Sequence, residues 1–126
     1  MNPVLVDTSV WVVHFRRGSG EVRRLLRADL MLTHPWVVAE IACGTPPARQ
    51  TTIGDLGDLR MSQTASLGET MAFVERERLF GLGCGLVDLV LLASVLITPG
   101  ARLWTLDKAL ARLAARFGVA HAFEAD

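Results

Sequence analysis

The stretch Val4-Leu-Val-Asp-Thr-Ser-Val-Trp11 decides the fold class. An apolar run of strand type ends in the acid Asp7, and Thr8-Ser9 then offers an N-cap for a helix through about residue 17. The same order returns at residues 103–110, where a short apolar run precedes an acid and a second helical pattern. Short strands that alternate with helices predict an α/β fold, an α/β/α sandwich with a short central parallel sheet.

Apolar periodicity and helix boundaries predict the remaining elements. Helices are expected over residues 21–29, 35–43, 66–80, 86–97 and 107–117, and strands over residues 31–33, 103–105 and 119–121. The pattern over 86–97 is apolar on all sides, which marks a buried helix. Gly81 and Gly83 are expected to end the helix that precedes it. Residues 45–65 are polar, and only a weak helix or strand is expected between 49 and 62.

Length and composition indicate one globular domain over residues 1–126. The chain has 126 residues, of which 51% are hydrophobic and 21% charged, so a disordered chain is excluded. No signal peptide is recognisable, and the longest apolar run is shorter than the roughly 20 residues of a membrane span. Two cysteines are too few for a disulfide framework, so we expect a cytoplasmic location with Cys43 and Cys84 as small buried hydrophobes.

Four acids interrupt or follow apolar segments, namely Asp7, Glu40, Asp88 and Asp107. A buried carboxylate needs a partner because its desolvation costs several kcal/mol, and the sequence offers no obvious buried lysine. A shared divalent cation would supply that partner, since Mg²⁺ binds carboxylate oxygens, waters and phosphate. With 13 basic and 13 acidic residues, the chain without these four acids would carry a net charge of +4. A basic frame around an acidic pocket suits phosphodiester chemistry.

Each acid also has a simpler interpretation when it is taken singly. Asp7 and Asp107 could cap helices, and Asp88 could be a first-turn acid that the helix dipole favours. Glu40 could be the exposed position of its helix. The metal hypothesis therefore depends on all four acids meeting in space.

A basic run lies between residues 16 and 27. Its five arginines are Arg16, Arg17, Arg23, Arg24 and Arg27, against one acid, Glu21. Such a run is most often a solvated helix face. Arginine also suits bidentate contacts with phosphate, so a surface that binds RNA phosphates is the second interpretation.

Four sequence blocks resemble the PIN-domain ribonucleases, and most of all the VapC-type toxins of bacterial toxin–antitoxin modules. In order they are VDTSVW at 6–11, VVAEIACG at 37–44, GLVDLVLLASV at 85–95 and LWTLDKAL at 103–110. The resemblance covers nearly the whole chain. It implies a PIN-like fold and an endoribonuclease that depends on Mg²⁺ or Mn²⁺. It also implies a structured RNA substrate such as transfer or ribosomal RNA, an inhibitory cognate antitoxin, and a homodimer.

The resemblance further assigns roles to four acids and two hydroxyl groups. The principal metal ligands would be Asp7 and Asp88. Two other acids would complete the site and orient water or a second ion, namely Glu40 and Asp107. Hydroxyl support for these acids would come from Ser9 and Thr105.

Two other classes of protein stay open. A phosphatase or phospho-receiver would use Asp7 as its nucleophile, but that pattern needs a second Asp where this chain has Ser9. It also needs an active-site lysine, and Lys108 is the only lysine in the chain. A non-catalytic PIN-like domain would bind RNA or protein without cleaving it, and its binding would not respond to a chelator.

Overall fold

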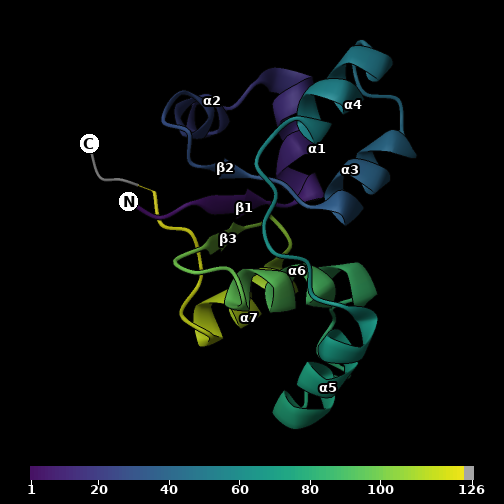
Figure 1. Ribbon diagram of the computed structural model, residues 1–126, viewed down its shortest axis with the longest axis vertical. Coiled ribbons are helices and arrows are strands. Elements are labelled where there is room, and N and C mark those ends of the chain that lie inside the picture. The colour runs from purple at the N-terminus through teal and green to yellow at the C-terminus, as the bar shows by residue number, and fades with distance from the viewer. Residues whose placement is uncertain (124–126) are drawn as a thin grey trace.

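The computed structural model, which describes residues 1–123, has a central parallel sheet between two groups of helices (Figure 1). In chain order the elements are β1 (Val4–Val6), α1 (Thr8–Arg17), α2 (Gly20–Arg27), β2 (Met31–Leu32), α3 (Pro35–Ala42), α4 (Arg49–Gly57), α5 (Leu67–Glu77), α6 (Leu86–Leu96), β3 (Arg102–Trp104) and α7 (Lys108–Arg116). Helices α1–α4 lie on one side of the strands and α5–α7 on the other (Figure 1). The predicted α/β/α sandwich is confirmed.

The sheet has the strand order β2-β1-β3, and both pairings are parallel. Val4 lies opposite Met31 on one side and Arg102 on the other, and Val6 lies opposite Trp104. All of β1 is buried, which explains why it is a continuous apolar run rather than an alternating one. Because the strands are parallel, their carboxyl ends share one edge of the sheet, and the segments that follow β1 and β3 meet there.

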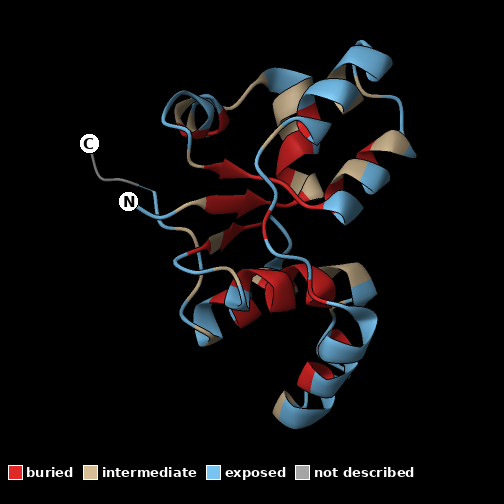
Figure 2. Cartoon of the chain, in the orientation of Figure 1, coloured by how far each residue is buried: buried red, intermediate tan, exposed pale blue. Residues whose placement is uncertain are grey.

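Helix α6 forms the centre of the layer on the other side of the sheet from α1–α4. Residues 89–95 of this helix are all buried, as its uniformly apolar sequence predicts (Figure 2). The buried helix therefore holds its first turn, which contains Asp88, in a fixed position against the sheet. Within residues 1–123, no helix combines the length and hydrophobicity needed to cross a bilayer.

The polar stretch 45–65 contains a helix, α4, that buries only Leu56. Its contacts are chiefly with α3. This helix was hard to predict because a single buried side chain leaves almost no apolar periodicity.

Two predictions of secondary structure are wrong: the end of one helix and the last strand. Helix α5 ends at Glu77 because Arg78 adopts a left-handed conformation with φ of 55°, well before Gly81. The expected last strand is reduced to one isolated bridge between Leu103 and Ala120. Backbone hydrogen bonds with β3 form only at that bridge, so residues 119–121 lie beside β3 without forming a strand.

Candidate metal centre

Asp7 is the most deeply buried acid of the site. It follows β1 directly, its amide donates to the carbonyl of Trp104 at 2.9 Å, and the residue is only 5% exposed. Its side chain makes no capping hydrogen bond to α1, so the capping interpretation does not account for it. Instead, its Oδ2 accepts hydrogen bonds from the hydroxyls of Ser9 at 2.8 Å and Thr105 at 2.7 Å.

The two hydroxyls also join the ends of the neighbouring strands. Ser9 Oγ accepts from the amide of Leu106 at 3.0 Å, and Thr105 Oγ1 accepts from the amide of Asp107 at 3.0 Å. Each hydroxyl therefore donates to Asp7 and accepts from the loop that follows β3. This network fixes the carboxylate and the loop that carries Asp107 relative to each other.

Asp88 lies half-buried in the first turn of α6. Burial raises the pKa of its carboxyl above the usual value of 3.8, and the charges of Asp7, Asp107 and Glu40 raise it further. The Gly85 amide, which donates to Asp88 Oδ2 at 3.4 Å, opposes this rise. The three other predicted acids thus lie close enough to Asp88 to disfavour its ionised form. Among residues 1–123, Asp88 and Asp107 have oxygens within 4.8 Å of each other, whereas Asp7 and Glu40 reach Asp88 through their charges.

The two remaining acids, Asp107 and Glu40, are exposed. Each partly fits the simpler role that the sequence suggested for it, Asp107 as a helix cap and Glu40 as an exposed helix position. Asp107 caps α7, because its Oδ1 accepts from the amide of Leu110 at 2.9 Å. Glu40 lies on an exposed position of α3, and its Oε1 accepts from the hydroxyl of Thr8 at 2.7 Å. Each of these two acids has an oxygen for which no hydrogen bond with a residue of the described range is found.

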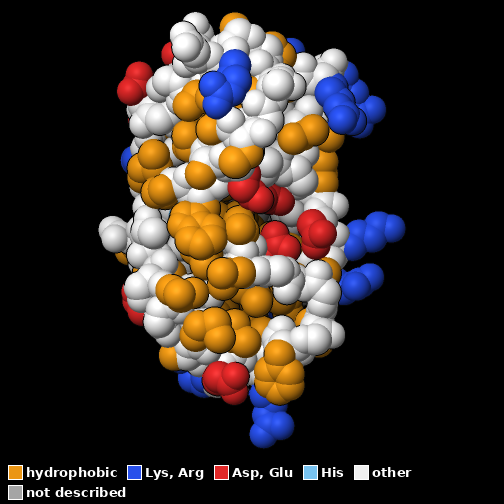
Figure 3. Space-filling model, turned by 90° about the vertical axis from the view of Figure 1, so that its right-hand side faces the viewer, with side chains coloured by type: hydrophobic (Ala, Val, Ile, Leu, Met, Phe, Trp, Pro, Cys, Tyr) orange, Lys and Arg blue, Asp and Glu red, His pale blue; other side chains and the backbone are white. Residues whose placement is uncertain are grey.

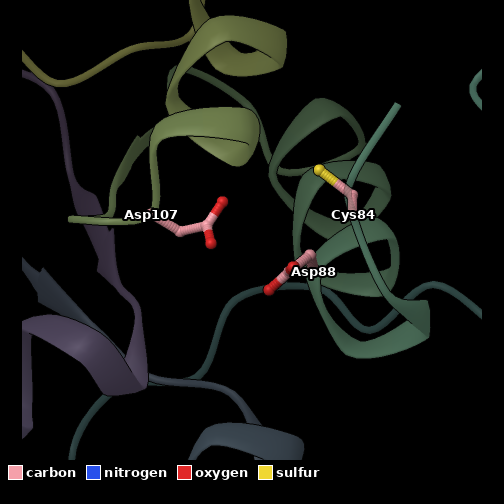
Figure 4. A group of neighbouring side chains, drawn as sticks. All are labelled: Cys84, Asp88 and Asp107. Atoms are coloured by element: carbon pink, nitrogen blue, oxygen red, sulfur yellow. The ribbon is translucent and has the colours of Figure 1, made fainter. Parts of the chain in front are cut away.

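Cys84 joins this group, which the sequence did not indicate. Its sulfur and one oxygen each of Asp88 and Asp107 all lie within 4.8 Å of one another (Figure 4). Burial and these two carboxylates raise the pKa of the Cys84 thiol to about 11. The expectation of two small buried hydrophobes is wrong, because Cys84 is half-buried beside the acids and Cys43 is exposed. Cys84 precedes α6 in an irregular segment, so no periodicity pointed to its position.

Within the described part of the chain, no cationic side chain pairs with the four acids. Over residues 1–123, no lysine or arginine forms a salt bridge with Asp7, Glu40, Asp88 or Asp107. Figure 3 shows acidic side chains gathered near the middle of this face, with hydrophobic side chains beside them. A set of carboxylate oxygens around a deeply buried acid fits Mg²⁺ or Mn²⁺, which favour oxygen ligands.

Comparison with known proteins identifies the family of this chain. No family model matches the sequence. Ribonuclease VapC32 of Mycobacterium tuberculosis strain H37Rv is 41% identical over 121 residues, which cover 96% of this chain and 98% of that relative. The protein of the same name in strain CDC 1551 / Oshkosh has the same identity over the same length. The chain belongs to the VapC-type PIN-domain toxin family.

In this VapC-family chain the arginines of residues 16–27 do not form one patch. Arg16 lines an open cavity of about 450 Å³ together with Glu40, one of the four acids. Arg24 lines a different cavity and donates two hydrogen bonds to Glu21, at 2.6 and 3.0 Å. Arg23 lies near His14 and helps burial to lower the pKa of that imidazole. The two others, Arg17 and Arg27, are exposed. A contact with RNA phosphates stays a prediction, and Arg16 has the best position for it.

Proposed function

We propose that this protein is an endoribonuclease toxin that cleaves RNA with the help of Mg²⁺ or Mn²⁺ bound by its four acids. One observation carries the proposal: the charges of Asp7, which is 5% exposed, of Glu40 and of Asp107 all act on Asp88, and no cationic side chain of the described residues pairs with these four acids. Such a group of like charges is unfavourable unless a cation joins it. The family relation supports a ribonuclease, since the relatives are named as such.

The residues around the acids have distinct tasks in this proposal. A divalent ion held chiefly by Asp7 and Asp88 would activate water and stabilise the charge that develops on the phosphate. Ser9 and Thr105 hold the Asp7 carboxylate in one orientation through their hydrogen bonds to Oδ2. Glu40 or Asp107, both exposed to solvent, would orient the attacking water and accept its proton. The reaction adds that water across a phosphodiester bond.

The remaining parts of the proposal concern location and partners. The whole chain, residues 1–126, would act as a single nuclease domain in the cytoplasm. Its substrate would be a structured RNA, transfer or ribosomal RNA, with Arg16 on a flanking phosphate. A cognate antitoxin would inhibit it, and the active form would be a homodimer. Several large apolar side chains are exposed on α5 and the segment after it, among them Leu67 at 59% and Phe80 at 61%, and these offer surface for such protein contacts.

The direct test is RNA cleavage with defined ions. Purified protein is incubated with total transfer and ribosomal RNA in Mg²⁺, in Mn²⁺ or with EDTA. We expect cleavage that EDTA stops, and Asp88→Asn should lose it. Asp55→Asn is the matched control, because Asp55 is an exposed acid on α4 outside the acidic group. Cleavage that continues in EDTA would contradict the proposal.

The alternative is a PIN-like domain that binds RNA or protein without catalysis. It predicts RNA binding with no cleavage, and equal binding in Mg²⁺ and in EDTA. Thermal unfolding separates the two, because an ion that binds only the folded protein raises the melting temperature. Stabilisation by Mg²⁺ that Asp88→Asn abolishes would favour the nuclease.

A further inference from the structure

We infer that Cys84 makes the acidic centre a binding site for a thiophilic divalent ion, Zn²⁺, and that Zn²⁺ bound there blocks the nuclease. This inference rests on the proposed function. The ligand set is the Cys84 sulfur together with one carboxylate oxygen each of Asp88 and Asp107, all within 4.8 Å of one another. Two of these residues belong to the proposed Mg²⁺ site, and Cys84 does not.

The spacing of these three atoms is within reach of a zinc site. Zn²⁺ lies about 2.3 Å from sulfur and about 2.1 Å from a carboxylate oxygen, so tetrahedral ligands are roughly 3.6 Å apart. Small rotations of three side chains would close the present spacing to that value. Both carboxylates retain an oxygen for this purpose, because Asp107 uses Oδ1 and Asp88 uses Oδ2 for their backbone contacts. The three side chains point toward one common space (Figure 4).

Asp7 gives an independent reason to expect a cation at this place. The residue is 5% exposed, and both of its hydroxyl partners donate to the same oxygen, Oδ2. No hydrogen bond from any part of the chain that the structure describes reaches its Oδ1. The charge of Asp7 acts on Asp88, so a deeply buried carboxylate adds to the negative charge around the three ligands. A cation in the pocket relieves the repulsion between the carboxylates.

The thiol decides which cation the pocket retains. Mg²⁺ is a hard ion that takes oxygen ligands, whereas thiolate selects softer ions such as Zn²⁺. On binding, the Cys84 S–H bond breaks, an S–Zn bond forms, and one proton is released to solvent for each ion bound. Because Zn²⁺ would occupy Asp88 and Asp107, those carboxylates would no longer serve the Mg²⁺-dependent reaction. Zn²⁺ would thus be an inhibitor that competes with Mg²⁺.

Cadmium is the probe, because its bond to thiolate absorbs in the ultraviolet and reports the sulfur ligand without any assay of activity. Two single-thiol proteins are titrated with Cd²⁺: Cys43→Ser, which keeps Cys84, and Cys84→Ser, which keeps the exposed Cys43. We expect the band in Cys43→Ser to saturate at one ion per chain, with release of one proton. Cys84→Ser should lack it and should bind Zn²⁺ at least about tenfold more weakly. Equal bands in the two proteins, or no band in Cys43→Ser, would overturn the inference.

A second pair of measurements separates this inference from the proposed function. Asp107→Asn in the Cys43→Ser protein should weaken Cd²⁺ binding while the sulfur band remains at saturation, and it keeps the test valid if Cys84→Ser does not fold. Cleavage of RNA by the wild-type protein in Mg²⁺ tests the nuclease alone. Addition of one equivalent of Zn²⁺ should then stop that cleavage, and excess Mg²⁺ should restore it. Cleavage that Zn²⁺ leaves unchanged would refute the inference and leave the nuclease intact.

Discussion

The two ends of the sheet hold opposite kinds of charge arrangement. At the carboxyl end, the charges of Asp7, Glu40 and Asp107 act on Asp88 in the first turn of α6, and no lysine or arginine of residues 1–123 forms a salt bridge with these acids. At the amino end, Glu21 pairs with Arg24 at 2.6 Å and with His121 at 2.7 Å, and Arg102 donates to the carbonyl of Gly118. The larger cavity, about 580 Å³, lies at the amino end, whereas the proposed reactive groups lie at the other.

The difference shows that charge compensation is a better guide to this site than cavity size. The amino-end charges satisfy one another and hold the segment around residues 118–121 against α2. The carboxyl-end charges repel one another, and in the proposed site a bound cation would offset that repulsion. We therefore expect substitutions at the carboxyl end to change catalysis and substitutions at the amino end to change stability.

The largest effect is expected for Asp7→Asn. This change removes the charge of the most buried ligand but keeps the shape of the side chain. We expect RNA cleavage to fall by about a thousandfold or more, because the ion supplies the principal stabilisation of the phosphate. Single-turnover cleavage in Mg²⁺ measures it, and Asp55→Asn serves again as the control. Activity within tenfold of wild type would show that Asp7 is not a metal ligand.

A smaller loss is expected for Thr105→Val, which removes one of the two hydroxyl groups that donate to Asp7 Oδ2. Groups that orient a metal ligand typically contribute 10- to 100-fold, so cleavage should fall by about tenfold. Thr105→Ser keeps the hydroxyl and should restore most of the activity. An equal loss in both variants would point to packing rather than to the hydrogen bond.

The amino end is tested by Glu21→Gln. Its pKa is lowered, first by the hydrogen bond from Arg24 and also by His121, against an opposing effect of burial. Because the folded pKa lies below the usual 4.5, the ionised pair stabilises the protein above that pH, and the benefit is lost as pH falls through the folded pKa. We expect Glu21→Gln to lower stability at pH 7 by roughly 1–2 kcal/mol in urea unfolding. RNA cleavage by Glu21→Gln in Mg²⁺ should stay at the wild-type level. A hundredfold loss of cleavage would contradict the expectation that substitutions at the amino end change stability and not catalysis.

Asp88 should show the opposite pH dependence. Its folded pKa is raised, so the folded state binds the proton more tightly, and the metal-free protein loses stability as pH rises above the unfolded value of 3.8. Asp88→Asn removes this loss and should melt about 2–4 °C higher than wild type at pH 7 in EDTA. The difference should shrink as pH falls toward 4, as measured by thermal unfolding. A mutant that melts lower at pH 7 would argue against repulsion between the acids.

The smallest effect concerns Arg16→Ala. Because Arg16 lines the same cavity as Glu40, its loss should weaken RNA binding a few-fold and reduce the salt dependence by about one phosphate contact. Arg27→Ala, in the same basic run but outside that cavity, is the matched control. Filter binding of RNA over a range of salt concentrations compares the two. Equal salt dependence of RNA binding in the two variants would mean that the basic run is a solvated helix face without a phosphate contact.

Much of the fold could be predicted from the sequence because its elements are short and strongly patterned. The apolar runs that end in Asp7 and near Asp107, and the uniformly apolar α6, were enough to predict a parallel sheet with helices on both sides. Helix α4 was only a weak expectation, since it buries a single leucine. The left-handed Arg78 that ends α5 could not be foreseen, because the tertiary structure imposes a conformation that arginine seldom adopts.

For the site, the sequence by itself singled out four carboxylates, because each interrupts or follows an apolar segment, and the resemblance to PIN-domain ribonucleases added the hydroxyls of Ser9 and Thr105. Only the tertiary structure decided which oxygen of Asp7 the two hydroxyls hold, that Asp107 also caps α7, and that Arg16 and Arg24 lie at different cavities. It also placed Cys84 beside Asp88 and Asp107. The reason is physical: periodicity records which side of an element is buried, whereas irregular segments and side-chain directions depend on contacts between residues far apart in the chain.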